Sequence, residues 1–154
     1  MNNKLITKRI NEEYPMSLLL LADPSEKLVK EYLKRGQCYI FEKDDKTIGV
    51  YVLLPTRPET VELVNIAVAE HYQTNGIGKA LVLDAIEKAK HYGYKIIEVG
   101  TGNSSIGQLA MYQKCGFRIT GVDRDFFPIH YEEEIVENGI VCVDMIRLTK
   151  QLQK

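Results

Sequence analysis

The residues best suited to chemistry lie in a glycine-containing segment that follows a strand-like run and precedes a helical apolar pattern. The segment has the sequence Gln73-Thr74-Asn75-Gly76-Ile77-Gly78-Lys79. Glycines between a strand and a helix let backbone N–H groups approach an anion, and the helix dipole favours negative charge at that end. The segment therefore predicts a loop that binds a phosphate group.

Two common nucleotide-binding patterns do not fit this segment. A Walker A loop would need glycine at position 73 and a hydroxyl residue at position 80, where the chain has Gln73 and Ala80. A dinucleotide fingerprint that starts at Gly76 would need a glycine at position 81, which is Leu81. A nucleotide-binding module is therefore disfavoured. The two glycines alone are also compatible with a tight turn into a helix.

A second segment supplies a more specific context. It has the sequence Leu109-Ala110-Met111-Tyr112-Gln113-Lys114-Cys115-Gly116-Phe117. This ending of a helix, together with the Gln-x-x-Gly-x-Gly pattern at 73–78, resembles two signatures of the GCN5-related N-acetyltransferase (GNAT) family. The resemblance covers almost the whole chain and implies an N-acetyltransferase. The implied fold is α/β, with a mixed, mostly antiparallel twisted central sheet of six to seven strands flanked by about four helices.

The resemblance places acetyl-CoA, the cosubstrate of the family, along this loop and the strand before it. The pyrophosphate would bind the loop amides at the helix N-terminus. In the family, the strand matching 64–68 splays away from the strand matching 94–99, and the pantetheine arm pairs with the edge that this exposes. The residues assigned to the cofactor are Ile66, Ala67, Val68, Gln73, Thr74, Asn75, Gly76, Ile77, Gly78, Lys79, Asn103, Ser105 and Tyr112.

The chain departs from the family pattern at one cofactor position. The family often has asparagine seven residues before the tyrosine of the second signature, where this chain has Ser105 and a nearby Asn103. Either residue could make the contact. Lys79 either neutralises phosphate charge or is solvated on its helix face. The backbone N–H of Ala67 or Val68 would polarise the thioester oxygen, as the resemblance implies.

Acetylation of an amine needs a base for the amine and an acid for the departing thiolate. A lysine-type amine has a pKa of about 10.4, so only about one molecule in 2,500 is neutral at pH 7. The resemblance points to Glu62 as the base, with a solvated strand-end carboxylate as the alternative, and Asn65 could orient a water. It points to Tyr112 as the acid, a role compatible with packing of its helix against the sheet.

The acceptor is expected to bind two segments that set specificity in the family, here 14–21 and 126–136. The second segment combines three glutamates at 132–134 with aromatic residues, a composition that suits a cationic amine. A solvated charged loop is the alternative. The expected partner is a small-molecule amine or the amine of a peptide or protein. A catalytically silent CoA-binding sensor or interaction domain is the alternative function.

Composition restricts the class of protein further. The 154 residues correspond to a single domain over 1–154, and a net charge of −1 argues against nucleic acid as a partner. No run approaches the ~18 apolar residues that span a bilayer, so no membrane partner is expected. Exposed edge strands would allow a homodimer.

Cysteine and histidine usage indicates a metal-free protein of a reducing compartment. Cys38, Cys115 and Cys142 are scattered, and neither a CxxC pair nor an HExxH pattern occurs. We therefore expect a cytoplasmic protein without a metal site. Cys115 lacks a histidine neighbour in sequence, which indicates a packed thiol rather than a nucleophile.

The elements that position these residues follow from apolar periodicity and turn signals. Strands are predicted at 5–10, 38–42, 47–54, 60–68, 94–99, 117–122 and 140–148. Helices are predicted at 24–35, 76–92 and 105–114, with a short buried helical turn at 16–22. Asp23 is the predicted N-cap of the 24–35 helix, with Pro24 at its first position. The segment around Phe126 and Phe127 is predicted to be irregular.

Overall fold

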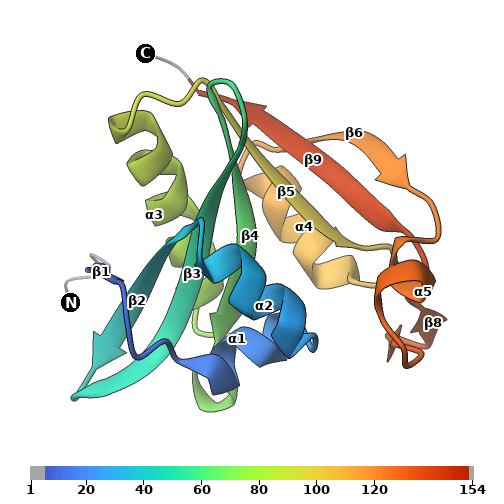
Figure 1. Cartoon of the computed structure of the whole chain (residues 1–154), viewed down its shortest axis with the longest axis horizontal. Helices are drawn as coiled ribbons and strands as arrows, with labels where there is room; N and C mark the ends of the chain where they lie inside the picture. The colour runs from blue at the N-terminus through green and yellow to red at the C-terminus, as the bar shows by residue number, and fades with distance from the viewer. Residues whose placement is uncertain (1–5, 153–154) are drawn as a thin grey trace.

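A computed structural model describes residues 6–152 and contains one mixed seven-stranded sheet. Its strand order is β1-β2-β3-β4-β5-β9-β6 (Figure 1). The strands are β1 (Lys8–Ile10), β2 (Gln37–Lys43), β3 (Lys46–Arg57), β4 (Thr60–Val68), β5 (Ile96–Gly102), β6 (Arg118–Asp123) and β9 (Met145–Gln151). Only β4 and β5 pair in parallel; all other neighbours are antiparallel. The predicted sheet is thereby confirmed.

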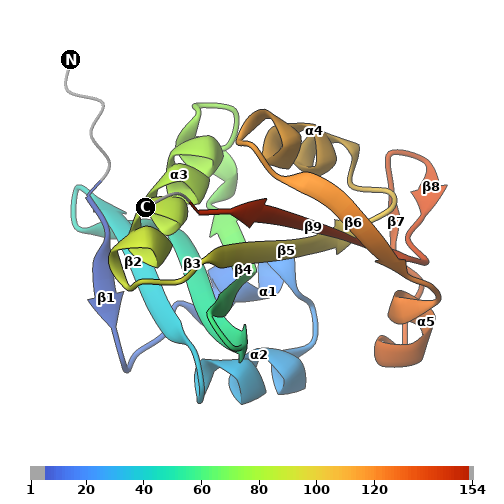
Figure 2. The same ribbon diagram turned by 90° about the horizontal axis from the view of Figure 1, so that it is seen from above.

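Helices cover both faces of this sheet. They are α1 (Met16–Ala22), α2 (Glu26–Leu33), α3 (Ile77–His91), α4 (Ile106–Lys114) and α5 (Phe126–His130), with a short 3₁₀ helix, η1 (Glu70–Tyr72). In Figure 2, α3 and α4 lie on one side of the sheet and α1 and α2 on the other. No helix in residues 6–152 has the length and apolar character needed to cross a bilayer.

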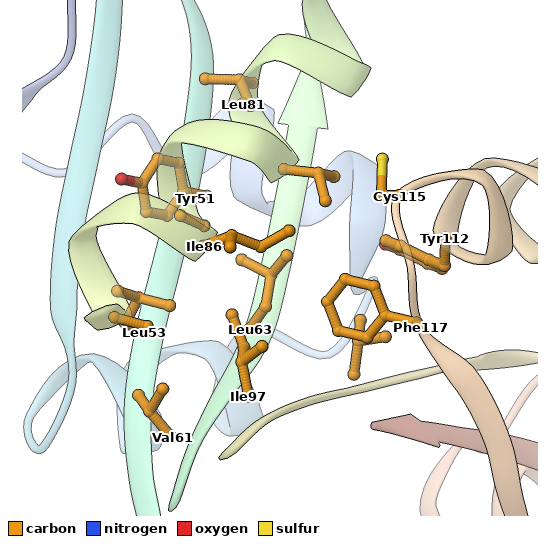
Figure 3. Packing of buried hydrophobic residues seen from close by; sticks show 14 of the residues in the cluster. Tyr51, Leu53, Val61, Leu63, Leu81, Ile86, Ile97, Tyr112, Cys115 and Phe117 are labelled. Carbon is orange, nitrogen blue, oxygen red and sulfur yellow. The ribbon is translucent and has the colours of Figure 1, made fainter. Parts of the chain in front are cut away.

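Two apolar clusters hold these layers together. One joins the sheet to α3 and α4 and includes Leu63, Leu81, Ile97 and Phe117 (Figure 3). The other joins the sheet to α1 and α2 and includes Leu19. Full burial of an aliphatic side chain of this kind stabilises the fold by about 1.5–3 kcal/mol. Because both faces are covered, β3 is buried without interruption from residue 48 to residue 54.

A β-bulge in β4 shapes the centre of the sheet. In the β3–β4 ladder, Val52 lies opposite Asn65 and Leu53 lies opposite Leu63, so Val64 is the extra residue. Pairing of β4 with β5 ends at Leu63, although β4 continues to residue 68. Figure 1 shows the two strands diverging beyond this point. The splayed opening expected from the family resemblance is therefore present.

The start of α2 differs from the prediction. Ser25 is the N-cap, because its Oγ accepts a hydrogen bond of 3.2 Å from the N–H of Leu28. Pro24 precedes the helix. The carboxylate of Asp23 instead accepts hydrogen bonds from two tyrosine side chains and from the N–H of Ser25. The prediction of Asp23 as N-cap was wrong because these partners compete for its oxygens.

The C-terminal region also differs from the prediction. Residues 126–130 form α5 rather than an irregular segment, and the predicted strand 140–148 is divided. Its first part, β8 (Ile140–Val141), pairs with β7 (Val136–Glu137) in a separate hairpin, and β9 starts only at Met145. Asn103 fixes the break, because its Oδ1 accepts hydrogen bonds from the N–H groups of Val143 and Asp144. Of the predicted first strand, Leu5 lies outside the described residues, and β1 covers only its last part.

Candidate active site

A cleft of about 820 Å³ opens where β4 and β5 diverge. Its walls come from β4 (residues 63–68), the end of β5 (100–102), α4 as far as Tyr112, and the end of α1 with the turn after it. Phe127 and Tyr131 also line it. The cleft thus has the form expected for an extended ligand that lies between two splayed strands.

The sequence-predicted residues divide into those that line this cleft and those that do not. The lining residues are Ile66, Ala67, Val68, Gln73, Thr74, Gly78, Ser105 and Tyr112. Asn75, Gly76, Ile77 and Lys79 lie between or beside them in the same loop and first helical turn but are not part of the lining. Glu62 and Asn103 are also outside the lining.

The loop before α3 has the backbone that anion binding requires. Gly76 is the N-cap of α3 in the left-handed region, with a φ of 78°, and no side chain caps the helix. Thr74 also has a positive φ, of 72°. The first turn of α3 contains no acidic residue, so nothing in it opposes a bound anion. The first N–H groups of α3 are therefore available to an anion.

Gln73 fixes this loop to the sheet. Its Nε2 donates a hydrogen bond of 2.9 Å to the carbonyl of Val68, the last residue of β4. Gln73, which the sequence assigned to the cofactor, thus also joins the end of β4 to the start of the loop. This bond fixes the position of the loop relative to the free edge of β4.

Tyr112 is a buried residue of the cleft lining. Its ring is almost fully buried and packs edge-on against Phe117, with ring centres 5.8 Å apart (Figure 3). Its hydroxyl makes no hydrogen bond within residues 6–152, and the residue lines the cleft. Burial raises the pKa of Tyr112, so the hydroxyl stays protonated at neutral pH. Cys115 lies in the same buried cluster, as expected for a packed thiol.

Glu62 lies on β4 before the bulge, and its side chain is only 17% exposed. Burial raises the pKa of this carboxyl, and the nearby Glu98 and Asp123 raise it further. The Arg147 guanidinium opposes this shift, with Nη1 at 3.5 Å from Oε2 of Glu62. The net upward direction is the one that a general base needs to act near neutral pH.

Arg147 also contacts two residues besides Glu62. It forms an ion pair of 2.7 Å with Asp123, and its guanidinium lies 5.7 Å from the centre of the Phe126 ring. A Cβ at Gly100 would lie 3.1 Å from Nη1 of Arg147 and 2.7 Å from the sulfur of Met145. The absence of a side chain at Gly100 thus gives Arg147 a path across β5.

The two candidates for the missing family asparagine have different surroundings. The side chain of Asn103 makes three hydrogen bonds, to the backbone of Val141, Val143 and Asp144. Ser105 lines the cleft and donates a bond of 2.7 Å to Oε1 of Glu137. Asn103 therefore fixes the chain between β8 and β9, whereas Ser105 faces the ligand space.

The sequence did not predict a chain of hydrogen bonds that joins three residues of the cleft lining through Tyr32. Nδ2 of Asn65 donates to the hydroxyl of Tyr32 over 2.8 Å, and this hydroxyl donates to Oδ2 of Asp23 over 3.1 Å. The hydroxyl of Tyr131 donates to Oδ1 of Asp23 over 2.8 Å. The chain connects β4, α2 and the segment after α5. No sequence signal pairs Asp23 with Tyr131, which lies 108 positions away.

The acidic segment lies next to Tyr131. A second hollow, of about 450 Å³, is lined by residues 130–135 together with Pro24 and Ser25. It shares Pro24, Tyr131 and Ile135 with the larger cleft. The three glutamates at 132–134 therefore adjoin the place where the acceptor is expected.

Comparisons with known proteins agree with this arrangement. A model of the Acetyltransferase (GNAT) family matches residues 6–117. The chain is 66% identical over 131 residues to the "Uncharacterized N-acetyltransferase YvbK" of Bacillus subtilis (strain 168), which covers 85% of this chain and 84% of that protein. Two solved structures are also similar over nearly the whole chain.

One of them is a Bacillus subtilis acetyltransferase in complex with CoA, with 59% identity and a TM-score of 0.93, covering 97% of this chain and 100% of that one. The other is a GNAT family acetyltransferase from Elizabethkingia anophelis with acetyl-CoA bound, with 48% identity and a TM-score of 0.95. It covers 98% of this chain and 100% of that one. The family match over residues 6–117 and these similarities establish that the chain belongs to the GNAT acetyltransferase family.

Proposed function

We propose that the chain is an acetyl-CoA-dependent N-acetyltransferase that moves the acetyl group to a primary amine by direct attack in a ternary complex. The observation that supports this most strongly is the position of the cleft. It runs along an edge of β4 that has no strand partner beyond Leu63 and reaches the uncapped start of α3. An amide-containing arm with a diphosphate at one end fits these two features.

The residues that would hold acetyl-CoA follow from the same geometry. The free edge of β4 at Ile66, Ala67 and Val68 would pair with the arm, and residues 73–79 would bind the diphosphate. Ser105 is the better candidate for the remaining polar contact, because the Asn103 side chain already makes three hydrogen bonds. Acetyl-CoA would supply an activated acetyl group, and CoA would leave as the free thiol once the thioester bond is broken.

Two side chains would handle the protons. Tyr112 gives its proton to the departing sulfur, a role supported by its place in the cleft lining and by a hydroxyl that has no hydrogen-bond partner within residues 6–152. Glu62 takes the proton of the amine. Because Glu62 does not line the cleft, this transfer passes through a water molecule. The N–H of Ala67 or Val68 polarises the thioester oxygen.

The acceptor would be an amine of a small molecule, a peptide or a protein, with the glutamates at 132–134 attracting cationic acceptors. We further propose that the chain is a single cytoplasmic domain. Its three cysteines are all buried and free, as in a protein of a reducing compartment.

Release of CoA thiol from acetyl-CoA in the presence of a broad amine and peptide panel tests this function. Amine-dependent release supports it. Binding of acetyl-CoA without release by any acceptor would instead favour a catalytically silent CoA-binding domain.

A further inference from the structure

We propose that Asp23 and Asn65, together with the aromatic wall of Phe127 and Tyr131, form the binding site for the acceptor amine and select a primary alkylammonium group. The inference rests on the proposed acetyltransferase function, since it names the acceptor subsite of the same cleft. All four residues line that cleft.

Asn65 has a polar atom without a partner. The residue is only 3% exposed, and its Oδ1 is buried with no hydrogen bond in the described part of the chain. Its two Nδ2 hydrogens are used by the carbonyl of Leu19 at 3.0 Å and by the hydroxyl of Tyr32 at 2.8 Å. Because a carbonyl only accepts, the amide cannot be turned around. Oδ1 thus has no donor among the described residues, in a side chain that lines the cleft.

The bulge at Val64 is what brings Asn65 to this place. Side chains alternate along a strand, so Asn65 would otherwise share a face with Val61 and Leu63, which pack on the α3 side. The extra residue moves Asn65 to the side of α1 and α2, where Leu19 and Tyr32 lie. A buried amide oxygen without a partner is unfavourable, so a donor from a ligand or a water is needed to complete the site.

Asp23 supplies the negative charge. Its carboxylate accepts three hydrogen bonds, from the hydroxyls of Tyr32 and Tyr131 and from the N–H of Ser25. A carboxylate has about four acceptor positions, so one remains for a ligand. The hydroxyl of Tyr32 links the two side chains, because it accepts from Nδ2 of Asn65 and donates to Oδ2 of Asp23.

Two aromatic rings complete the wall. Phe127 and Tyr131 are stacked, with ring centres 5.5 Å apart. Aromatic faces next to a carboxylate favour a cation with an attached alkyl chain. They are less suited to an anion or to a neutral polar group.

The arrangement favours a primary amine as the acceptor. After the ammonium loses one proton, a primary amine keeps two N–H donors, one for Asp23 and one for Asn65. Its lone pair then remains free for the attack on the acetyl carbon. A secondary amine has only one N–H at this stage and leaves one of the two acceptors without a donor. The site therefore distinguishes primary from secondary amines by hydrogen-bond count.

The test measures binding of n-butylamine to the full chain with CoA present, and its acetylation with acetyl-CoA. The variants are Asp23→Asn and Asn65→Leu, which are close in size to the wild-type residues. Asp45→Asn is the control, because Asp45 is exposed in the β2–β3 turn and asparagine tolerates its positive φ. Melting temperature and acetyl-CoA affinity report on folding and on the cofactor half of the cleft.

We expect Asp23→Asn to raise the Kd and KM for n-butylamine by about 10-fold or more, as for loss of a charged hydrogen bond. Asn65→Leu should raise them by about 3- to 10-fold. Asp45→Asn should change neither. In the wild type, n-butanol should not compete with n-butylamine, and N-methylbutylamine should have a lower kcat/KM.

The inference is overturned if both folded variants bind n-butylamine like the wild type, if n-butanol competes equally, or if the wild type does not bind n-butylamine. If a variant does not fold, the wild-type comparison of the three probes decides. If the variants weaken n-butylamine binding but no CoA is released, the acceptor site is supported and the proposed acetyltransferase function is contradicted. If CoA is released and both variants keep the wild-type Kd and KM for n-butylamine, the function is supported and the acceptor site is contradicted.

Discussion

The guanidinium of Arg147 lies 3.5 Å from the carboxylate of Glu62, although β5 separates their two strands in the sheet. Gly100 of β5 makes this approach possible, because any side chain there would meet Arg147. Glu62 lies on the face opposite α3, because its neighbours Val61 and Leu63 pack on the α3 side. The contact with Arg147 also moderates the rise in the pKa of Glu62 that burial causes.

Removal of the Arg147 charge should therefore move the pH dependence of catalysis. Arg147→Gln removes the influence that lowers the pKa of Glu62, so this pKa rises further. The acid limb of kcat/KM, measured against pH, should shift to higher pH. The same limb should disappear in Glu62→Gln. An unchanged limb in both variants would mean that another group, or water alone, is the base.

Glu62 should also impose a pH-dependent loss of stability. Its pKa is higher in the folded than in the unfolded chain, so its contribution is most favourable below the unfolded pKa and is lost as the pH rises through the folded pKa. Glu62→Gln should consequently raise the free energy of unfolding more at pH 7 than at pH 4. Urea denaturation at the two pH values measures this. An equal change at both would contradict the raised pKa.

Tyr112→Phe should lower kcat by about 100-fold or more, within the usual range for loss of a general acid. Acetyl-CoA affinity and melting temperature should change little, because the hydroxyl makes no hydrogen bond within residues 6–152 and the ring is retained. Steady-state kinetics and acetyl-CoA titration provide the measurements. If Tyr112→Phe keeps the wild-type kcat, Tyr112 is not the acid that protonates the departing thiolate.

Gly76→Asp should greatly weaken acetyl-CoA binding, since it places a negative charge at the start of α3. Gly93→Asp is the matched control: Gly93 follows the other end of the same helix, with a φ of 86° and open space for a Cβ. Both substitutions should destabilise the fold by about 1–2 kcal/mol through the left-handed backbone. Only Gly76→Asp should reduce acetyl-CoA affinity, and equal affinities would remove the loop from the cofactor site.

Ser105→Ala and Asn103→Ala should have opposite profiles. Ser105→Ala should weaken acetyl-CoA binding with little loss of stability. Asn103→Ala should lower the free energy of unfolding by about 1–3 kcal/mol, because it leaves backbone groups around β8 and β9 without partners. Calorimetric titration and urea denaturation separate the two effects. A loss of affinity confined to Asn103→Ala would reassign the contact.

Local signals explain what could be predicted from the sequence. The glycine loop before α3 and the end of α4 are short patterns, and their structure is set by residues that are close in the sequence. The strand β4 was predicted from its run of β-branched residues. These signals were sufficient for the sheet and for the part of the cleft lining near β4, the glycine loop and Tyr112. They depend little on distant parts of the chain.

The features that escaped prediction depend on contacts between distant segments. Asp23 followed by Pro24 is typical of a helix start, and only the contact with Tyr131 shows that its carboxylate belongs to the cleft. The bulge at Val64 leaves no mark in an apolar strand sequence, yet it decides the face on which Asn65 lies. Likewise, the division between β8 and β9 depends on the side chain of Asn103.

A crystal structure of this protein with CoA tests the central claim most directly. We expect the diphosphate at the backbone amides of residues 73–79, and the pantetheine arm along β4 between Ile66 and Val68 with its sulfur near Tyr112. A diphosphate bound away from this loop, or an arm outside the opening between β4 and β5, would contradict the account.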